Sequence, residues 1–326
     1  MKLSIVIPHY TEGLEVITPL LDSIKIQQDI DFGEIEAIIV NDGDTKALQP
    51  YLFTDYPFKI GVHTIEHKGV SAARNYGLDR AEGEYVMFCD TDDMFCSMFA
   101  LQVYFKAMKE APYCIIRGSF IEDQFIDGEW KLIRHDNDLS FVHGKMFRKQ
   151  FLLDNELRFD EELTIHEDGY FVALANLVSQ GNIRETQVAT YLWKYRDDSV
   201  VRKDSELYLF KTYGNLMDTR IKLCRQLKNR EMWTEYFQTI SKTVWDSYYD
   251  FQKPDCLKPE NAELILKAKK NFKRFYTEFA EDYKSININD IAAMKYLCHD
   301  NAFKNGMRVE QQTISQFLTE IVLLKG

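Results

Sequence analysis

The sequence is poor in glycine, proline and long apolar runs, and each shortage excludes a class of protein. Only 15 glycines and 7 prolines occur in 326 residues, while 45% of the residues are hydrophobic. This composition excludes low-complexity linkers and favours a fully folded chain. No run approaches eighteen apolar residues, and the first apolar stretch, Leu3–Ile7, is too short for a signal peptide. We therefore expect a cytoplasmic protein, with any membrane contact at the inner face.

Cysteine is also scarce, and its six positions show no metal-like pairing. Cys89 and Cys114 fall in apolar, strand-like runs, where a reduced thiol packs as a small hydrophobe. A chain of this size with a large core does not depend on cross-links for stability, so we expect no disulfide framework.

The net charge of −11 is unevenly distributed along the chain. Residues 1–205 contain 21 basic and 35 acidic side chains, whereas residues 206–326 contain 19 and 16. The acidic first part argues against binding to duplex nucleic acid, which depends on Lys and Arg at the phosphates. The change in pattern near residue 205 predicts two domains, 1–205 and 206–326.

Residues 67–95 carry the most informative pattern. A glycine turn is followed by a helix pattern, a second turn at Gly83, and an apolar strand from Tyr85 to Cys89. The strand leads into a polar run, which consists of Asp90, Thr91, Asp92 and Asp93. Adjacent carboxylates repel one another, and a divalent cation with oxygen ligands is the simplest partner for them. From these residues alone, an acidic loop that caps the next helix is the alternative.

This stretch resembles the donor-binding core of family 2 glycosyltransferases with the GT-A fold. In that family, a Gly-Val-Ser-x-Ala-Arg-Asn-x-Gly helix leads through a strand into Asp-x-Asp-Asp. The matching residues here are Gly69, Val70, Ser71, Ala73, Arg74, Asn75, Gly77, Asp90, Asp92 and Asp93. The resemblance implies an α/β GT-A domain, with a Rossmann-like mixed sheet flanked by helices, followed by an α-helical C-terminal domain that the resemblance does not cover.

The resemblance also implies roles for the residues of this stretch. Mn²⁺ or Mg²⁺ would be held mainly by Asp92, with Asp90 on the metal or the ribose and Asp93 in the same ligand set. Thr91 would lie beside the nucleotide-sugar. Arg74 offers a planar fork of donors suited to phosphate or carboxylate, and relatives use the equivalent arginine to hold the nucleotide and the metal-binding loop together.

Two earlier strands end in residues that resemble the family's base-binding positions. The run Leu3–Ile7 is followed by Pro8 and Tyr10, as in the family's Pro-x-Tyr, whose aromatic ring lies beside the nucleotide base. The run Ile35–Val40 leads into Asp42, which inherits by position a hydrogen bond to uracil. The sequence Asn-Asp-Gly-Asp departs from the family's Asp-Asp-Gly-Ser and is also a good turn without a ligand. For His67, where relatives often carry asparagine, we expect an exposed side chain, with a donor to the nucleotide as the alternative.

A second acidic pair, Glu167 and Asp168, follows some 75 residues after Asp90. A helix that begins there would direct its free amides and its positive end toward these carboxylates. The resemblance assigns the catalytic base to Asp168 and a bracing role to Glu167. Taken alone, the pair is also typical of a stabilised helix N-terminus. The neighbouring His166 is either a metal ligand, an acceptor contact or a surface residue, and we expect the last.

Two further segments resemble the family. Residues 143–148 resemble a Gly-Lys-Leu-Tyr-Arg stretch on the acceptor side, with a basic turn before a helix at 149–155 as the alternative. The strand-like run Val188–Arg196 is followed by Ser199, and the pattern resembles a Tyr-Arg-x-x-x-Ser loop that closes over the diphosphate. Arg196 would then offset charge on the leaving group, with a solvated loop arginine as the alternative.

Periodicity predicts the remaining elements. We expect helices within 13–28 and 98–111, strands at 59–66 and 114–120, and a hairpin over 120–133. From residue 206 the pattern is helical, and Pro259 opens a helix with an apolar face and a basic face. We expect this domain to pack on the first. The alternatives are pairing with a second copy, or contact of the basic face with an anionic polymer or a membrane surface.

The resemblance implies a metal-dependent inverting glycosyltransferase that moves a sugar from a nucleotide-diphosphate sugar, expected to be a UDP-sugar, to an acceptor hydroxyl. The family's habits favour a cell-surface glycan or polymer as the acceptor. A sugar nucleotidyltransferase is the first alternative, but its usual glycine-rich loop is missing after the first strand. A non-catalytic nucleotide-binding scaffold is the second, and it would tolerate loss of the acidic motifs that this chain retains.

Overall fold

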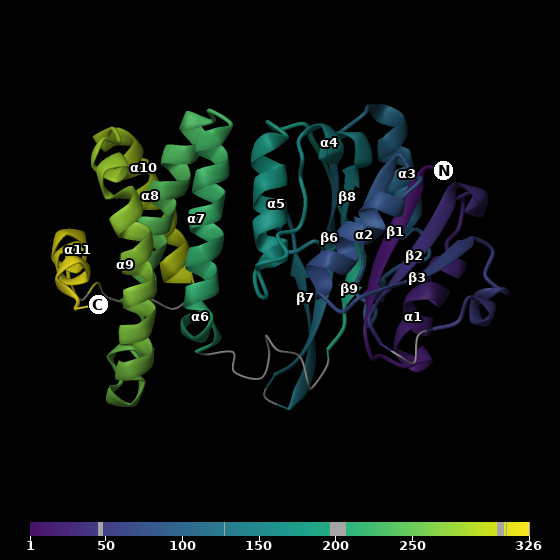
Figure 1. Cartoon of the computed structure of the whole chain (residues 1–326), viewed down its shortest axis with the longest axis horizontal. Helices are drawn as coiled ribbons and strands as arrows, with labels where there is room; N and C mark the ends of the chain where they lie inside the picture. Colours follow the sequence, from purple (N-terminus) through teal and green to yellow (C-terminus); the bar gives the residue numbers. More distant parts are fainter. Residues whose placement is uncertain (45–47, 127, 196–206, 305–309, 311, 326) are drawn as a thin grey trace. The chain divides into compact units, whose positions relative to one another are not determined.

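A computed structural model describes residues 1–44, 48–126, 128–195, 207–304, 310 and 312–325. The chain divides into two compact units, an N-terminal unit Met1–Asp197 and a C-terminal unit Asp198–Gly326 (Figure 1). The domain boundary expected at residue 205 lies outside the described residues. Each unit has its own buried core and is described separately below.

The N-terminal unit alternates strands and helices. Its strands are β1 (Leu3–His9), β2 (Ile35–Asp42), β3 (Lys59–Ile65), β4 (Tyr85–Phe88), β5 (Met94–Phe95), β6 (Ile115–Ile126), β7 (Glu129–His135), β8 (Lys145–Arg148) and β9 (Ile183–Trp193). Its helices are α1 (Leu14–Lys25), η1 (Phe32–Glu34), η2 (Pro50–Phe53), α2 (Val70–Arg80), α3 (Ala100–Glu110), α4 (Lys149–Asp154) and α5 (Glu167–Val178).

The strands form one mixed sheet. Within the described residues their order is β3-β2-β1-β4-β8-β6-β9-β5, and β7 pairs with β6. Strands β3, β2, β1 and β4 are parallel, while β8 runs antiparallel to both of its neighbours. Parallel strands covered on both faces require nearly continuous apolar sequence, and β1 and β2 are buried at every position. The apolar runs identified in the sequence therefore form the parallel half of the sheet.

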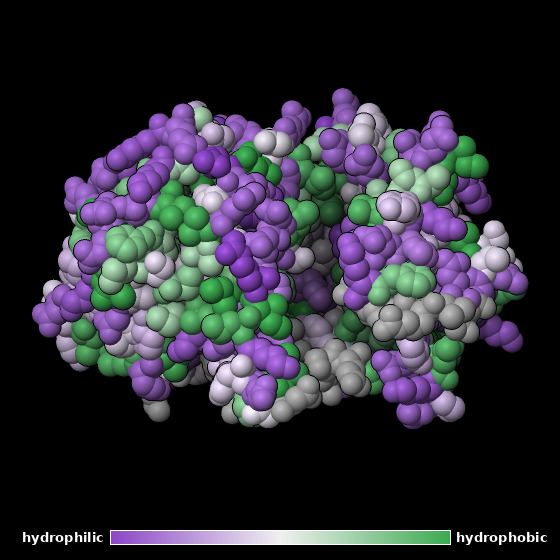
Figure 2. Space-filling model, turned by 180° about the vertical axis from the view of Figure 1, so that it is seen from behind, coloured by the Kyte–Doolittle hydropathy of each residue, from purple (hydrophilic) through white to green (hydrophobic). Residues whose placement is uncertain are grey.

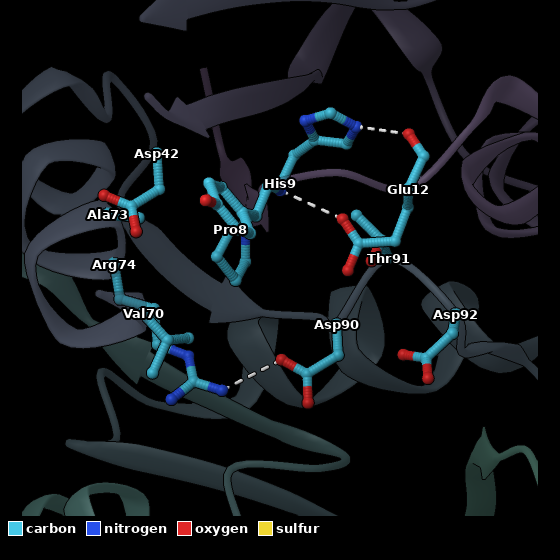
Figure 3. Close-up of a pocket in the computed structure, with 11 residues that line it drawn as sticks. Pro8, His9, Glu12, Asp42, Val70, Ala73, Arg74, Asp90, Thr91 and Asp92 are labelled. Carbon is cyan, nitrogen blue, oxygen red and sulfur yellow. Dashed lines mark hydrogen bonds and ion pairs between the residues drawn. The ribbon is translucent and has the colours of Figure 1, made fainter. Parts of the chain in front are cut away.

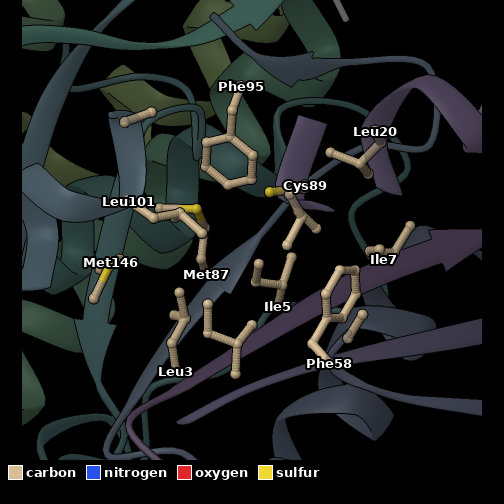
Figure 4. Close-up of a cluster of buried hydrophobic side chains, with 14 of the residues drawn as sticks. Leu3, Ile5, Ile7, Leu20, Phe58, Met87, Cys89, Phe95, Leu101 and Met146 are labelled. Atoms are coloured by element: carbon tan, nitrogen blue, oxygen red, sulfur yellow. The ribbon is translucent and has the colours of Figure 1, made fainter. Parts of the chain in front are cut away.

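Alternation along β1 divides its side chains between two layers. Leu3, Ile5 and Ile7 lie in one cluster with Leu20 of α1 and Leu101 of α3 (Figure 4). Burying each such aliphatic side chain contributes about 1.5–3 kcal/mol of transfer free energy. Helices α1 and α3 thus cover one face of the sheet, and α2 covers the other.

Helix α2 approaches β1 unusually closely. A Cβ atom added at Gly77 would lie 2.3 Å from Cγ1 of Val6, a separation that real Cβ atoms do not show. Only glycine at position 77 permits this contact. The close packing fixes the helix at the carboxyl edge of the parallel strands, and Arg74, one turn earlier, is 4% exposed there.

Three elements differ from the sequence expectation. Residues 145–148 form β8, a strand inside the sheet, because the apolar side chains of Met146 and Phe147 are buried between β4 and β6. The alternative of a basic turn at this stretch is therefore wrong, and Lys145, at 1% exposure, is inside the protein. The last strand spans Ile183–Trp193, earlier than the run at 188–196, and the two-residue β5 had no sequence pattern.

The C-terminal unit is helical in its described residues. Its elements are α6 (Tyr208–Lys211), α7 (Tyr213–Asn229), α8 (Trp233–Asp250), η3 (Pro254–Leu257), η4 (Pro259–Asn261), α9 (Ala262–Lys284), α10 (Ile288–Lys304) and α11 (Ile314–Leu323). Helix α8 packs against α7, α9 and α10, and α11 packs against α9. The unit is thus built around α8 and α9.

Helix α9 has the two faces that its periodicity predicts. The buried face consists of Ile265, Ala268, Phe272, Phe275, Tyr276, Phe279 and Tyr283. Part of the basic charge is used inside the unit: Arg274 pairs with Asp218, and Lys269 lies 2.6 Å from Glu320. Lys273 donates to the main-chain carbonyls at the end of α11. Because these basic side chains are paired inside the unit, the basic face of α9 is less suited to binding an anionic polymer or membrane surface.

Within the described residues, no helix combines the length and the apolar character needed to span a bilayer. On the face shown in Figure 2, hydrophilic residues cover much of the surface, and hydrophobic residues form patches between them.

The close contact between Gly77 and Val6 predicts that alanine at position 77 lowers the free energy of unfolding, the opposite of its usual effect inside a helix. Alanine normally stabilises a helix interior by about 1 kcal/mol relative to glycine. Here Gly77→Ala forces its methyl group into a β-branched side chain that has few alternative rotamers, so we expect a loss of roughly 1–3 kcal/mol in urea unfolding.

The matched control is the double variant Gly77→Ala/Val6→Ala, which frees the space at the contact. Its loss of unfolding free energy relative to the wild type should be smaller than the sum of the losses in the two single variants. A single Gly77→Ala variant more stable than the wild type would contradict the close approach of α2 and β1.

Candidate active site

The carboxyl ends of β1, β2 and β4 meet at one edge of the sheet, where α/β sheets place ligands. A pocket of about 240 Å³ opens there (Figure 3). It is lined by Pro8, His9, Tyr10, Glu12, Asp42, Val70, Ala73, Arg74, Asp90, Thr91 and Asp92. In Figure 3, Asp42, Ala73 and Arg74 lie on one side, and Glu12, Thr91 and Asp92 lie on the other. Most of the nucleotide-binding and metal-binding positions expected from the sequence thus line one pocket.

A pair of stacked rings lies at this pocket. The rings of Tyr10 and His67 stack with centroids 4.5 Å apart and an interplanar angle of 19°. The imidazole Nδ1 of His67 also lies 2.9 Å from a carboxylate oxygen of Asp42. Both rings are substantially exposed, with 43% exposure for Tyr10 and 59% for the His67 side chain. An exposed, pre-aligned ring pair of this kind provides a flat surface for a planar ligand.

Asp42 is buried and holds the turn that begins α2. Its two carboxylate oxygens accept hydrogen bonds from the main-chain amides of Lys68 and Gly69, each at 2.8 Å. Gly69 has φ of 95°, a conformation that glycine adopts without strain. Asp42 therefore connects the end of β2 to the start of α2, in addition to lining the pocket.

Arg74 joins the two acidic motifs. One guanidinium nitrogen donates to Asp90 at 2.9 Å and another donates to Glu167 at 2.9 Å. The guanidinium also lies over the ring of Phe159, with its carbon 5.1 Å from the ring centroid. The contact between Arg74 and Glu167 spans 93 residues of sequence, so one buried side chain holds the two acidic motifs together. Loss of one member of a buried charge network typically costs about 3–5 kcal/mol.

In this network, the neighbouring charges shift the pKa values of Arg74 and Asp90 in the direction opposite to the effect of burial. Burial lowers the pKa of Arg74, but Asp90, Glu167 and Asp168 outweigh it and raise that pKa overall. Burial also raises the pKa of Asp90, and the Arg74 charge more than reverses this effect, so the Asp90 carboxyl stays ionised. The ion pair is therefore maintained over the whole physiological pH range.

Asp168 and Glu167 open helix α5, as their position predicts. His166 precedes them as the N-cap with φ of 66°, and the main-chain amide of Gly169 donates to Asp168 at 2.7 Å. Burial and then the charge of Glu167 raise the pKa of Asp168 to about 7, because Arg74 offsets only part of these effects. A carboxylate with a pKa near the working pH is suited to general-base chemistry.

The last aspartate of the run, Asp93, is fully buried. Its carboxylate accepts hydrogen bonds from the hydroxyl of Tyr191 at 2.7 Å and from the main-chain amide of Lys194 at 3.0 Å. The Tyr191 hydroxyl also accepts from the amide of Asp90 at 3.2 Å. Burial, followed by the charges of Asp90 and Asp92, raises the pKa of Asp93 well above its usual value.

His143 completes this corner of the site. The ligand-type atoms of Asp90, Asp93 and His143 all lie within 4.8 Å of one another. Burial lowers the pKa of His143 to about 4, so its imidazole is neutral at physiological pH. In the sequence, His143 belongs only to the stretch that resembles the family's acceptor side. No local sequence pattern indicates that it lies beside the aspartates.

Sequence reasoning also missed two pocket residues, Glu12 and His9. Glu12 accepts from the amide of Tyr10 at 2.9 Å, and the His9 ring contacts the Glu12 carbonyl at 2.7 Å. Their proximity to Pro8 in the same loop was the available clue. Two expected residues, Arg196 and Ser199, lie outside the described residues.

Asn75, the residue after Arg74, braces the same region. Its side chain donates to the carbonyl of Phe159 and accepts from the amide of that residue, at 2.9 and 3.0 Å. It also donates to Glu161 at 3.0 Å. Helix α2 and the segment before α5 are therefore fixed side by side, which supports the Arg74 bridge.

Comparison with known proteins places this geometry in context. Residues 4–165 match the family described as "Glycosyl transferase family 2". The teichoic acid poly(glycerol phosphate) polymerase of Staphylococcus epidermidis is 32% identical over 187 residues, which cover 52% of this chain and 25% of that protein. The minor teichoic acid biosynthesis protein GgaA of Bacillus subtilis is 29% identical over 310 residues, which cover 87% of this chain and 62% of that protein. The chain spans about a quarter of the length of the first of these relatives.

Among solved structures, residues 1–349 of Staphylococcus aureus TarS in complex with UDP-GlcNAc align with a TM-score of 0.61 and 19% identity, over 94% of this chain and 93% of that one. A likeness of this kind shows a shared fold. The GT-A architecture with a helical C-terminal region, expected from the motifs, is therefore confirmed.

The raised pKa of Asp168 predicts a pH-dependent stability. In the unfolded chain an aspartate loses its proton near pH 4, whereas Asp168 in the folded protein retains it up to about pH 7. Stability therefore falls as the pH rises through this window. Asp168→Asn removes the penalty, and the variant should be more stable than the wild type above pH 7 by roughly 1–3 kcal/mol, with no difference below about pH 4.

Urea unfolding of both proteins between pH 4 and pH 8 measures this difference. Asp55→Asn, at an exposed aspartate far along the chain from both motifs, is the control and should follow the wild type at every pH. An Asp168→Asn variant with the same pH profile as the wild type would show that Asp168 is not desolvated.

Proposed function

Because residues 4–165 belong to glycosyl transferase family 2, we propose that this chain transfers a sugar from a nucleotide-diphosphate sugar to a hydroxyl group of a polymer acceptor. A UDP-sugar is the proposed donor, and the proposed transfer inverts the anomeric centre by a single displacement. Since the curated relatives are much longer than this chain, the proposal concerns the reaction of the described site.

The observation that carries the proposal is the Arg74 bridge. It brings the aspartate run after β4 and the Glu167-Asp168 pair at the start of α5 into one site. A donor-binding pocket beside a carboxylate with a pKa of about 7 is the minimum required for base-assisted transfer to a hydroxyl. Neither motif alone provides both parts.

In the proposed complex, the nucleobase lies against Tyr10 and its stacked partner His67, with Pro8 below and Asp42 within the same pocket. Asp90 and Thr91 then face the ribose and the diphosphate, and Arg74 compensates the charge of Asp90. The Asp42 carboxylate accepts from two main-chain amides and lies beside Nδ1 of His67, and a carboxylate with about four lone-pair sites can accept one further donor, as a uracil N–H would supply. This arrangement supports uridine as the base.

The family implies a divalent cation, and the residues of this site fit one. Several carboxylates gather at the pocket, two of them from Asp90 and Asp92, while Arg74 is already divided between Asp90 and Glu167. Oxygen-rich sites of this kind suit Mn²⁺ or Mg²⁺. When bound, the ion supplies Lewis-acid stabilisation of the leaving diphosphate.

Asp168 is the proposed catalytic base. Its carboxylate takes the proton from the acceptor hydroxyl as the oxygen attacks the anomeric carbon, and the nucleoside diphosphate leaves on the opposite side. Glu167 is held by Arg74, so it braces the base and raises its pKa without taking the proton. Proton transfer to a positioned base of this kind contributes roughly 10²–10⁴ in rate.

The acceptor class is proposed from the relatives, whose names include a poly(glycerol phosphate) polymerase and teichoic acid biosynthesis proteins. We propose a cell-surface polymer hydroxyl as the acceptor, presented at the inner face of the membrane. A nucleotidyltransferase is less consistent with the pocket, because β1 ends at His9 and leads into Tyr10 and not into a glycine-rich loop.

Donor binding can be tested without knowing the acceptor. Calorimetry with a panel of nucleoside diphosphates, with and without Mn²⁺, should show uridine-selective binding that depends on the metal. Asp92→Ala should weaken the metal-dependent part by at least about tenfold. Asp79→Ala, an exposed aspartate on the far end of α2, is the control and should bind as the wild type does. Absence of nucleotide binding under all conditions would contradict the proposal.

The base assignment predicts a second result. With a donor identified by the panel, Asp168→Asn should lower the rate of sugar transfer by roughly 10²–10⁴ while sparing UDP binding. Because the base acts in its ionised form, the wild-type rate should rise with pH through about 7. Full transfer activity in Asp168→Asn, or a rate that is flat across this range, would remove Asp168 from the mechanism.

A further inference from the structure

Strands β6 and β7 form a ribbon that extends beyond the rest of the sheet. Residues 123–126 of β6 pair only with β7, and β7 has no other partner strand among the described residues. Figure 1 shows these two strands running past the ends of their neighbours. A two-stranded ribbon is only marginally stable by itself, and both of its faces are open. Its side chains can therefore contact a ligand.

Large apolar side chains are exposed on this ribbon. Trp130 is 63% exposed, Phe125 is 49% exposed and Leu132 is 71% exposed. Phe125 and Trp130 lie opposite each other in the strand pair, and their ring centroids are 5.2 Å apart. Leu132, two residues after Trp130, points to the same face of the ribbon. These three residues, which we call the hairpin platform, form an exposed apolar cluster of the kind that indicates an interaction surface.

The hairpin platform is connected to the proposed active site. The main-chain amide of Lys194 donates to Asp93 at 3.0 Å, and Asp93 ends the aspartate run whose other members line the pocket. The next residue, Tyr195, packs edge-to-face on Trp130, with ring centroids 5.3 Å apart and an interplanar angle of 88°. A polymer whose hydroxyl group reacts at the site has further units beside it. The hairpin platform is close enough to contact such units.

The charge of the hairpin distinguishes between two kinds of polymer. Residues 120–135 contain four acidic and two basic side chains. One of the basic side chains, Arg134, is paired with Asp136 at 2.8 Å. Binding of phosphate groups depends on Lys and Arg, so this ribbon is poorly suited to a polyol phosphate chain. Carboxylates accept hydrogen bonds from hydroxyl groups, which neutral sugars supply in number.

We propose that the hairpin platform binds a neutral sugar unit of the polymer acceptor, with one face of the sugar ring packed on Trp130. The inference rests on the proposed function, which requires a polymer acceptor, and it narrows that acceptor to one with neutral saccharide units. A pyranose ring has an apolar face of C–H groups and an edge of hydroxyl groups. The aromatic rings suit the first, and acidic side chains of the same ribbon, including Asp123 and Glu129, suit the second.

The test measures binding of neutral tetrasaccharides to the full chain by saturation-transfer NMR and calorimetry, with UDP and Mn²⁺ present. The panel contains tetrasaccharides of glucose, galactose, mannose and N-acetylglucosamine, and a poly(glycerol phosphate) of matched length is the anionic probe. At least one tetrasaccharide should bind the wild type. Trp130→Ala should weaken this binding by roughly three- to tenfold, as expected for the loss of one aromatic contact. Trp130→Phe keeps a ring and should retain most of the affinity.

Trp233→Ala is the matched control. Trp233 is also an exposed tryptophan, at 48%, and it packs edge-to-face on Tyr236 with centroids 5.9 Å apart, but it belongs to the C-terminal unit. This variant should bind the tetrasaccharide as the wild type does. The UDP affinity of every variant, measured in the same buffer, should equal that of the wild type, which shows that the fold and the donor pocket are intact.

Several outcomes overturn the inference. If the wild type binds UDP but no tetrasaccharide, or if Trp130→Ala binds the tetrasaccharide equally well, the hairpin platform is not an acceptor site and the proposed function still stands. If only the poly(glycerol phosphate) binds, and Trp130→Ala weakens it, the polymer class is wrong. If no tetrasaccharide binds and the wild type sediments as a dimer that Trp130→Ala dissociates, the platform is an interface between copies.

UDP binding separates this inference from the proposed function. A tetrasaccharide that binds through Trp130 in a chain with no affinity for UDP would support the hairpin platform and contradict the proposed function. If the wild type binds neither UDP nor any tetrasaccharide, both fail together.

Discussion

The structure of the site depends on one buried guanidinium. Arg74 is the shared partner of Asp90 and Glu167, and without it two acidic segments would meet inside the protein without the cation that contacts both of them. The bridge requires α2 to lie close to the sheet, which the absence of a side chain at Gly77 permits. It also requires the segment before α5 to be fixed, which Asn75 achieves through Phe159. Packing and electrostatics are therefore parts of one arrangement.

The same arrangement leaves negative charge that Arg74 does not neutralise. Asp168 and Asp93 both have raised pKa values, chiefly because they are buried and near other carboxylates. Folding alone would favour fewer acids here, so their presence is best explained by chemistry. A base must lose its proton near neutral pH, and a cation must have ligands to bind. These acidic groups lower the stability of the folded protein, and the same groups provide the base and the cation ligands that the proposed function needs.

Much of this could be predicted from the sequence, because the relevant patterns are local. Apolar runs that lead into Pro8, Asp42 and Asp90 identified the parallel half of the sheet and its ligand-binding edge, and the spacing on α9 identified its buried face. The C-terminal unit shows the limit of such patterns, because they predicted its helices but not how its charges are paired. The roles of individual site residues, including Arg196 and Ser199, remain predictions.

The contributions of Tyr191 and His143 could not be predicted, since they arise from contacts between distant segments. Tyr191 bonds Asp93 across 98 residues, and no local spacing indicates this. Strand β8 was likewise not predicted, because its short sequence becomes a strand only when β4 and β6 flank it. Such features follow from the assembled sheet.

Arg74 joins Asp90, Glu167 and Asp168 in one electrostatic site. Carbon-13 NMR titration of the Asp168 carboxyl group in the wild type and in Arg74→Met measures this coupling directly and requires no substrate. We predict an apparent pKa of about 7 in the wild type and a higher value in the variant, because the positive charge that partly offsets burial is removed. An Asp168 carboxyl that titrates near pH 4 in both proteins would contradict the account.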